Sequence, residues 1–157
     1  MSYPLPLKTV ALIGRQDSPE VGDSIAALAG FFQARGVAVL VETETAIQTE
    51  HLLGRAALNT ADCADFVQIG TCADLAVVVG GDGTMLHAAR QLGRYDRPLV
   101  GINQGRLGFM TDIARSDMLE AMSQLMDGAF TQEERLLLDT EVVFGGASAS
   151  WQPQANL

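Results

Sequence analysis

A short apolar strand that passes through a glycine-rich turn into a helix is the feature that most constrains this chain. The apolar run Leu75–Val79 has the length of a strand, three glycines surround Asp82 in the next four residues, and a helical pattern continues to Leu92. Glycines let a ligand approach the main chain, and the first N–H groups of a helix attract phosphate. The segment therefore predicts a turn that faces phosphate.

Asp82 stands out in this turn because phosphates repel a carboxylate. Its presence predicts a general base for a hydroxyl group, or an acid that holds a cation. Nearby phosphates would raise its pKa, whereas a bound cation would lower it. The alternative is that Asp82 only caps a helix that begins near Thr84. The turn alone does not decide between these interpretations.

Apolar runs and helical periodicity alternate along the chain. We expect strands at residues 9–14, 37–42, 75–79 and 99–102, and helices at 18–35, 45–58, from 84 and at 116–127. Ser18 and Ser116 would cap two of these helices, and Gly36 and Gly128 would end them. Residues 59–72 give no assignment. The order predicts an open, mostly parallel three-layer Rossmann-like α/β sheet, with ligands beyond the carboxyl ends of its strands.

The length and pattern predict one domain and a piece of another. Residues 1–130 would form the α/β nucleotide-binding domain, and residues 131–157 the truncated beginning of a second, β-rich domain. Residues 136–144 alternate partly like a strand, and the Gly/Ala/Ser-rich residues 145–150 dilute that pattern.

The formal net charge of −9 argues against general binding to nucleic acid or to anionic membranes. No apolar run reaches the roughly 18 residues of a membrane span, and the N-terminus lacks the pattern of a signal peptide. We therefore expect a soluble, cytoplasmic protein in which Cys63 and Cys72 are free thiols.

Five arginines lie close to the glycine-rich segments in the sequence, namely Arg90, Arg94, Arg97, Arg106 and Arg115. Guanidinium groups bind phosphate oxygens well, so these residues could form an electropositive pocket for a small anion. The alternative for each of them is an ordinary solvated surface charge. The single lysine, Lys8, precedes the first strand, which excludes a P-loop with its Gly-Lys-Ser/Thr ending.

The segment Val100–Asp112 predicts a second ligand wall, because glycines and an asparagine follow a strand. Asn103 could donate to and accept from a ribose or a base, and Phe109 could lie against a planar ring. The alternative makes Asn103 a turn residue and Phe109 part of the core. Taken singly, each residue favours that alternative.

Together, the segments Val79–Leu86 and Gly101–Asp112 resemble NAD kinases, specifically the bacterial enzymes that use ATP or polyphosphate. Lipid kinases and phosphofructokinases share only the first segment. The resemblance covers about residues 7–145. It implies transfer of a phosphoryl group to the 2′-hydroxyl of the adenosine ribose of NAD, which gives NADP, in a domain like the N-terminal domain of NAD and diacylglycerol kinases.

The resemblance also implies the site residues. Asp82 would accept the proton, and Phe109 would contact the adenine region. The whole nucleotide site would comprise Gly81, Asp82, Gly83, Thr84, His87, Asn103 and Phe109. Mg²⁺ would arrive with ATP or polyphosphate, because the sequence shows no compact cluster of carboxylates for a metal site of its own.

The chain departs from the family near its end. NAD kinases continue into a strand-rich domain with an Asn-acidic pair, whereas Asn156 is followed here by Leu157. We therefore expect an incomplete kinase with little activity alone, from a family whose full-length members are generally homo-oligomers. Two alternatives stay open: a noncatalytic nucleotide-binding remnant, and a lipid kinase of the same superfamily. The sequence leaves open the choice of ATP or polyphosphate and the use of NADH.

Overall fold

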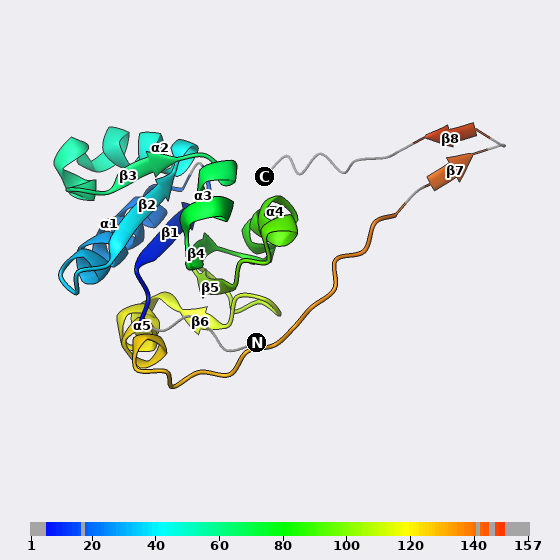
Figure 1. Cartoon of the computed structure of the whole chain (residues 1–157). Coiled ribbons are helices and arrows are strands. Elements are labelled where there is room, and N and C mark those ends of the chain that lie inside the picture. Colours follow the sequence, from blue (N-terminus) through cyan, green and yellow to red (C-terminus); the bar gives the residue numbers. More distant parts are fainter. Residues whose placement is uncertain (1–5, 17, 141, 145–146, 150–157) are drawn as a thin grey trace.

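The chain folds around one parallel sheet (Figure 1). The computed structural model describes residues 6–16, 18–140, 142–144 and 147–149. The strands of this sheet are β1 (Thr9–Gly14), β2 (Ala38–Glu42), β3 (Asp62–Ala64), β4 (Leu75–Gly80), β5 (Leu99–Asn103) and β6 (Ile113–Ala114). Their order is β3-β2-β1-β4-β5-β6, and every neighbouring pair is parallel. The predicted open α/β sheet is confirmed, with two short strands, β3 and β6, that the sequence did not indicate.

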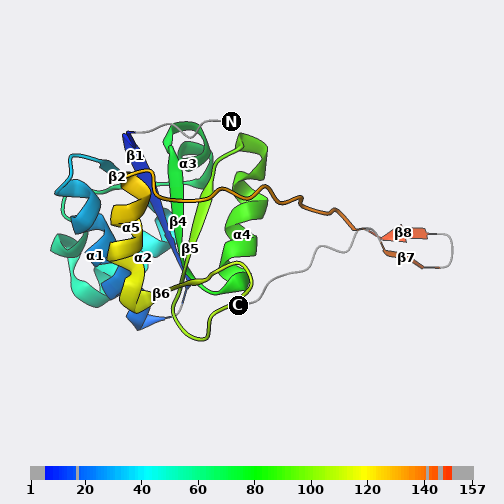
Figure 2. The same ribbon diagram turned by 90° about the horizontal axis from the view of Figure 1, so that it is seen from below.

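Helices cover both faces of the sheet. They are α1 (Pro19–Gln33), α2 (Thr43–Leu53), α3 (Phe66–Cys72), α4 (Asp82–Leu92) and α5 (Met118–Met126). Short 3-10 helices occur at η1 (Arg55–Leu58), η2 (Gly93–Tyr95) and η3 (Arg115–Asp117). Helices α1, α2 and α5 lie on one face, and α3 and α4 on the other (Figure 2). This is the three-layer arrangement that the sequence predicted.

The core is divided by the alternation of side chains along β1 and β4. Val10 and Leu12 of β1 pack with Phe32 of α1 in one cluster, whereas Ala11 and Ile13 pack with α3 and α4 in the other. All six residues of β4 are buried. Because both faces of the central strands are covered, their sequences are continuous apolar runs rather than alternating ones.

The predicted ends of the first two helices hold in part. Helix α1 starts after Ser18 with Pro19 at its first turn, and Gly36, at φ 74°, follows its end. Helix α2 begins two residues earlier than we predicted, because the carboxylate of Glu42 accepts from the N–H groups of Glu44 and Thr45 at 3.0 and 2.9 Å. It also ends at Leu53 instead of Leu58, since the chain turns there at a glycine with φ 85° and continues as η1.

Two short elements explain why residues 59–72 gave no assignment. Strand β3 has three residues and α3 has seven, which is too short for a clear period. A capping box starts α3: Asp65 accepts from the N–H of Gln68 at 2.8 Å, and the side chain of Gln68 accepts from the N–H of Asp65 at 2.9 Å.

The start predicted for the last helix is wrong. Ser116 lies within η3 and donates its hydroxyl to the carboxylate of Asp117 at 3.1 Å, so it does not cap α5, which begins at Met118. The predicted end is confirmed, because Gly128 has φ 80° just after the helix.

The strand order creates a crevice at the edge of the sheet. Strand β1 continues to α1 on one face, and its neighbour β4 continues to α4 on the other face. Gly14 at the end of β1 lies beside Val79 of β4, and Gly80 lies beside Asn103 of β5. Ligands in open α/β sheets bind at such a switch point, outside the carboxyl ends of the strands.

Residues 131–140 leave this domain as an exposed, extended segment (Figure 1). They lead to β7 (Val142–Phe144) and β8 (Ala147–Ala149), which pair with each other in an antiparallel ladder. Residues 145–146, part of the segment that dilutes the strand pattern, lie outside the described residues. Asn156, where the chain departs from the family, also lies outside them. The domain boundary at residue 130 stays a prediction. No described helix has the length and apolar content needed to cross a membrane.

Candidate active site

The two glycine-rich turns meet at Asp82. This residue opens α4, and its carboxylate accepts hydrogen bonds from the loop that follows β5. Oδ2 accepts from the N–H of Phe109 at 2.9 Å, and Oδ1 accepts from the N–H groups of Met110 and Thr111 at 3.0 and 3.2 Å. The hydroxyl of Thr111 also donates to Oδ1, at 3.1 Å. Both segments therefore belong to one crevice.

The interpretation of Asp82 as a cap for a helix near Thr84 is wrong. Helix α4 begins at Asp82 itself, Gly81 occupies the N-cap position, and no side chain of the described residues caps this end of the helix. The carboxylate is turned away from its own helix and toward the next loop, so its role lies between two segments of the fold.

Hydrogen bonds to the charged form lower the pKa of Asp82. The largest cause is the N–H of Phe109, followed by that of Met110; partial burial opposes them, and Thr111 adds two smaller contributions in the same direction. Asp82 is thus ionised at neutral pH. Its Oδ1 takes three of the hydrogen bonds and Oδ2 only one, so Oδ2 keeps the capacity to accept a further proton donor.

Close approach explains two of the glycines around Asp82. A Cβ at Gly80 would lie 2.5 Å from Oγ1 of Thr84, and a Cβ at Gly108 would overlap the Asp82 carboxylate itself. Both glycines are described by the structure, and neither has a positive φ. At these two positions glycine is needed for close packing, and not for a left-handed backbone.

Gly81 and Gly105 differ from these packed glycines. A Cβ at either position would meet no atom within 4 Å. Both residues line the same pocket, described below. Their bare main chain therefore faces space that a ligand can enter.

Asn103 holds the second loop in place. Its side chain is buried, at 4% exposure, and its Nδ2 donates to the carbonyl and hydroxyl of Thr111 at 3.3 and 2.8 Å. Its Oδ1 accepts from the N–H of Gly105 at 2.7 Å. These contacts support the turn interpretation, and the role of Asn103 toward a ribose or base stays a prediction.

Phe109 is not part of the core, so that alternative is wrong. Its side chain is 94% exposed, although its N–H is tied to Asp82 at 2.9 Å. The hydrogen bond fixes the main chain of Phe109, and the exposed ring is accessible to a planar partner.

A pocket of about 360 Å³ opens at the crevice, and we call it the Asp82 pocket. Its first wall is Gly80–Asp82 and its second is the loop from Asn103 to Gly108. The third wall comes from the turn between β1 and α1. The residues that line the pocket there are Arg15 and Ser18 of the turn and Glu20 of the first turn of α1.

Four residues of the predicted nucleotide site do not line this pocket: Gly83, Thr84, His87 and Phe109. His87 is exposed, and its ring packs edge-on against Phe66 of α3, with 5.6 Å between the ring centroids. Their roles toward a nucleotide stay predictions.

Of the five arginines near the glycine-rich segments, only Arg106 lines the Asp82 pocket. Arg97 instead donates to the carbonyls of Gly70 and Thr71, at 2.7 and 3.2 Å. Arg94 lies over the ring of Tyr95, and Arg115 is 4.0 Å from Asp23. For these arginines the interpretation as surface or structural charges fits better than the anion pocket.

Comparison with known proteins agrees with the motif resemblance. Residues 10–130 match the family model of the ATP-NAD kinase N-terminal domain. The chain belongs to the NAD kinase family. The NAD kinase of Azoarcus sp. (strain BH72) is 47% identical over 139 residues, which are 88% of this chain and 45% of that protein. That of Paraburkholderia phytofirmans is also 47% identical, over 88% of this chain and 44% of its own length.

The chain therefore spans less than half the length of these curated NAD kinases. Among solved structures, yeast NADH kinase complexed with NADH superposes with a TM-score of 0.67 and 19% sequence identity. The match covers 80% of this chain and 37% of the yeast chain. At this identity the likeness concerns the fold, which agrees with the family assignment.

In this member of the NAD kinase family, sequence reasoning missed one wall of the pocket. Arg15, Ser18 and Glu20 come from the turn after the first strand and the start of α1, which carry no glycine-rich motif. The signal that could have found them is the strand order, because a turn beside β4 is a candidate only once β1 is known to be its neighbour.

Proposed function

We propose that this domain carries the proton acceptor and the phosphate site of an NAD kinase. The reaction would transfer a phosphoryl group from ATP or polyphosphate to the 2′-hydroxyl of the adenosine ribose of NAD. The observation that carries the proposal is the ionised Asp82 carboxylate, which the loop at residues 109–111 holds at the wall of a pocket with two arginines.

In the proposed step the ribose oxygen attacks the terminal phosphorus of the donor, and the bond from that phosphorus to the leaving oxygen breaks. The hydroxyl proton moves to Asp82, with Oδ2 as the acceptor because it holds only one hydrogen bond. A lowered pKa makes Asp82 a modest base. A modest base is sufficient for phosphoryl transfer, because with a loose transition state the protein's main contribution is to orient the nucleophile and stabilise charge.

The positive side of the pocket suits the donor phosphates. Arg15 and Arg106 both line it, and helix α4 begins there, with Gly81 as N-cap and Asp82 as its first residue. Guanidinium groups and free helix N–H groups are strong partners for phosphate oxygens. The donor's terminal phosphates would thus lie beside the carboxylate that takes the proton.

Mg²⁺ fits this site as an ion carried by the donor. In the part of the chain that the structure describes, no three His, Cys, Asp or Glu side chains gather to hold a metal ion. Mg²⁺ is bound in such enzymes through one or two carboxylates and the substrate's phosphates. When bound, the ion would neutralise phosphate charge, and Asp82 or Glu20 are the pocket carboxylates that could face it.

On the acceptor side we propose that Phe109 contacts the adenine of NAD. Gly83, Thr84, His87 and Asn103 remain candidates for holding the rest of the nucleotide. A fully exposed aromatic ring, fixed at its main chain beside Asp82, is well placed for stacking on a base. A cytoplasmic location and assembly into homo-oligomers remain predictions from the sequence.

The test is NADP formation from NAD and Mg-ATP by the 157-residue chain, with Asp82→Asn beside Asp112→Asn. Asp112 is an exposed aspartate of the same loop and serves as the matched control. We expect weak turnover, lowered about 10²–10⁴-fold by Asp82→Asn and unchanged by Asp112→Asn. Equal turnover of the two variants would remove Asp82 from its role.

A second candidate is a nucleotide-binding module without turnover. It is favoured by the hydrogen bonds that Asp82 accepts, because they lower the pKa of this carboxyl and make it a weaker base. Calorimetry with NAD and ATP separates the two, because this candidate requires binding and no NADP. The lipid kinase alternative finds no support in the comparisons.

A further inference from the structure

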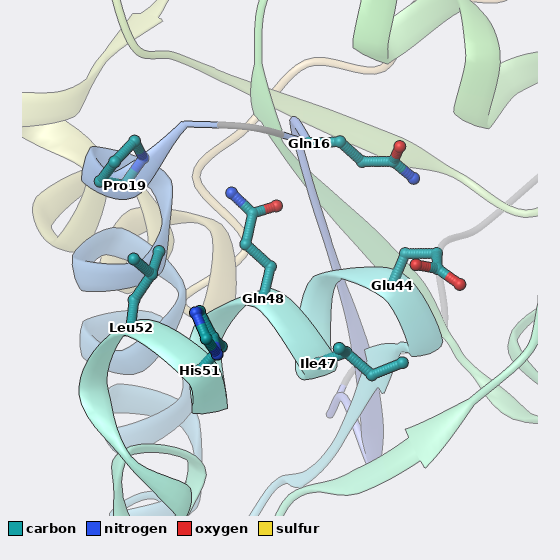
Figure 3. A pocket seen from close by; sticks show the side chains of 7 residues that line it. All are labelled: Gln16, Pro19, Glu44, Ile47, Gln48, His51 and Leu52. Carbon is teal, nitrogen blue, oxygen red and sulfur yellow. The ribbon is translucent and has the colours of Figure 1, made fainter.

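A second hollow, of about 430 Å³, lies between the β1–α1 turn and helix α2 (Figure 3). We call it the α2 pocket. The turn contributes Gln16, α1 contributes its first residue, Pro19, and α2 contributes side chains that follow one side of the helix. These are Glu44, Ile47, Gln48, His51 and Leu52. The volume lies in the ordinary range for small-molecule sites.

The α2 pocket and the Asp82 pocket share the turn between β1 and α1. Arg15, Ser18 and Glu20 line the Asp82 pocket, whereas Gln16 and Pro19 line the α2 pocket. The lining residues of the turn and of the start of α1 thus alternate between the two hollows. A single extended ligand that crosses this turn could occupy both.

The two pockets differ in the chemistry they offer. The Asp82 pocket has two guanidinium groups, which suit phosphates. The described residues that line the α2 pocket include no arginine or lysine; they combine apolar surface from Pro19, Ile47 and Leu52 with polar groups. The polar groups are the amides of Gln16 and Gln48, the carboxylate of Glu44 and the imidazole of His51. An amide donates and accepts, as the edge of a nucleobase does. The lining suits a planar group that carries no negative charge and has N–H donors at its edge, because a carboxylate accepts from such donors and repels an anion.

The strand order decides which nucleoside this is. Along the edge of the sheet the strands run β2, β1, β4, β5, so Asp82 at the end of β4 lies between the turn after β1 and the loop after β5. Phe109, the proposed contact for the adenine of NAD, belongs to the loop after β5. The α2 pocket lies on the β2 and β1 side. The acceptor and this pocket are therefore on different sides of Asp82.

We propose that the α2 pocket binds the base of the phosphoryl donor, a purine nucleoside triphosphate whose phosphates occupy the Asp82 pocket. The inference rests on the proposed function and deepens it. The α2 pocket would make this chain prefer ATP to inorganic polyphosphate, since polyphosphate has no group to place there. The sequence alone had left that choice open.

The experiment compares Mg-ATP with magnesium tripolyphosphate in calorimetric titrations of the 157-residue chain. The two ligands share the phosphates and differ in the nucleoside. We expect ATP to bind at least about tenfold more tightly, a difference that a well-placed apolar and hydrogen-bonded group readily supplies. Equal affinities, or no binding of either ligand, would overturn the proposal.

The decisive variant is Ile47→Asp, because Ile47 lines the α2 pocket and is 57% exposed, so the substitution spares the core. The matched control is Val67→Asp, at a residue of α3 that is 52% exposed and lines neither pocket. We expect Ile47→Asp to reduce ATP affinity to that of tripolyphosphate and to leave tripolyphosphate binding unchanged. Val67→Asp should change neither. A loss of both ligands in Ile47→Asp, or of neither, contradicts the α2 pocket as the base site.

The outcomes separate this inference from the proposed function. If Asp82→Asn abolishes NADP formation while Ile47→Asp leaves ATP affinity intact, only the base site is wrong. If Ile47→Asp weakens ATP selectively and NAD is neither bound nor phosphorylated, the base site stands and the assignment as an NAD kinase domain fails.

Discussion

The loop after β5 and the turn after β1 form two walls of the same pocket, and they are built differently. The loop is fixed by the hydrogen bonds of the Asn103 side chain and by those of residues 109–111 to Asp82. In the turn, the N–H of Arg15 donates to the carbonyl of Val79 at 2.8 Å, and Ser18 makes no capping bond. Gln104 joins the loop to helix α1 through Nε2, which donates to Oγ of Ser24 at 2.8 Å.

This difference indicates a division of roles. The protein's own hydrogen bonds position the proton acceptor before any ligand binds, which lowers the cost of arranging it during a reaction. The turn instead offers Arg15 to solvent, where phosphates can order its side chain. Substitutions in the loop should therefore affect stability, whereas substitutions in the turn should affect mainly anion binding.

Gly108→Ala should produce the largest loss of stability. The new Cβ would occupy the space of the Asp82 carboxylate, which must then leave its donors in the loop. We expect a loss of about 2 kcal/mol in the free energy of unfolding, as for other overpacked sites. Urea denaturation measures it. Gly105→Ala, where a Cβ meets open space, is the control and should cost less.

Thr111→Val should have the next largest effect. The Thr111 side chain is buried, accepts from Nδ2 of Asn103 at 2.8 Å and donates to Asp82 at 3.1 Å. Valine keeps the shape but leaves both partners with one bond fewer, which should cost about 1 kcal/mol in urea denaturation. Thr111→Ser should recover much of it. A valine variant as stable as the parent would show that the loop does not depend on this network.

Acid should weaken the loop's contribution in a defined direction. The pKa of Asp82 is lower in the folded protein, so its hydrogen bonds add stability above the unfolded pKa of about 4 and this gain is lost as the pH falls through the folded pKa. Urea midpoints from pH 6 down to strongly acidic solution should show the parent losing its advantage over Asp82→Asn. A constant advantage across this range would contradict the assignment.

Arg15→Ala should have the smallest effect on stability, within about 0.5 kcal/mol, because its side chain is exposed and makes no hydrogen bond or ion pair with another described residue. Its effect should instead appear in titrations with tripolyphosphate, as a several-fold loss of affinity that salt diminishes. A clear loss of stability with unchanged binding would reverse the proposed division between the walls.

The fold was largely predictable because its central strands are long and apolar. The strands at residues 9–14, 75–79 and 99–102 were each found to within one residue, and Gly36 and Gly128 marked the ends of helices as expected. Elements of two to seven residues, such as β3, β6 and α3, carry too few positions to show a period. Their existence depends on packing against an already formed sheet.

The candidate site was predictable in part. The glycine motifs identified Asp82 and the second loop, and the family comparison agrees with that resemblance. They did not reveal that Phe109 is exposed or that the side chain of Asn103 makes hydrogen bonds within the loop. Both facts depend on contacts between residues distant in the sequence, so no local sequence pattern predicts them.

The sequence by itself determined the family, the parallel α/β architecture and the acidic residue among the glycines, because each is written in short stretches of adjacent residues. Only the tertiary structure decided which groups donate to Asp82. It also decided that Arg15 lines the Asp82 pocket, whereas Gln16 lines the α2 pocket. The reason is that strand order sets these neighbours. Strand order results from burying apolar faces over the whole domain.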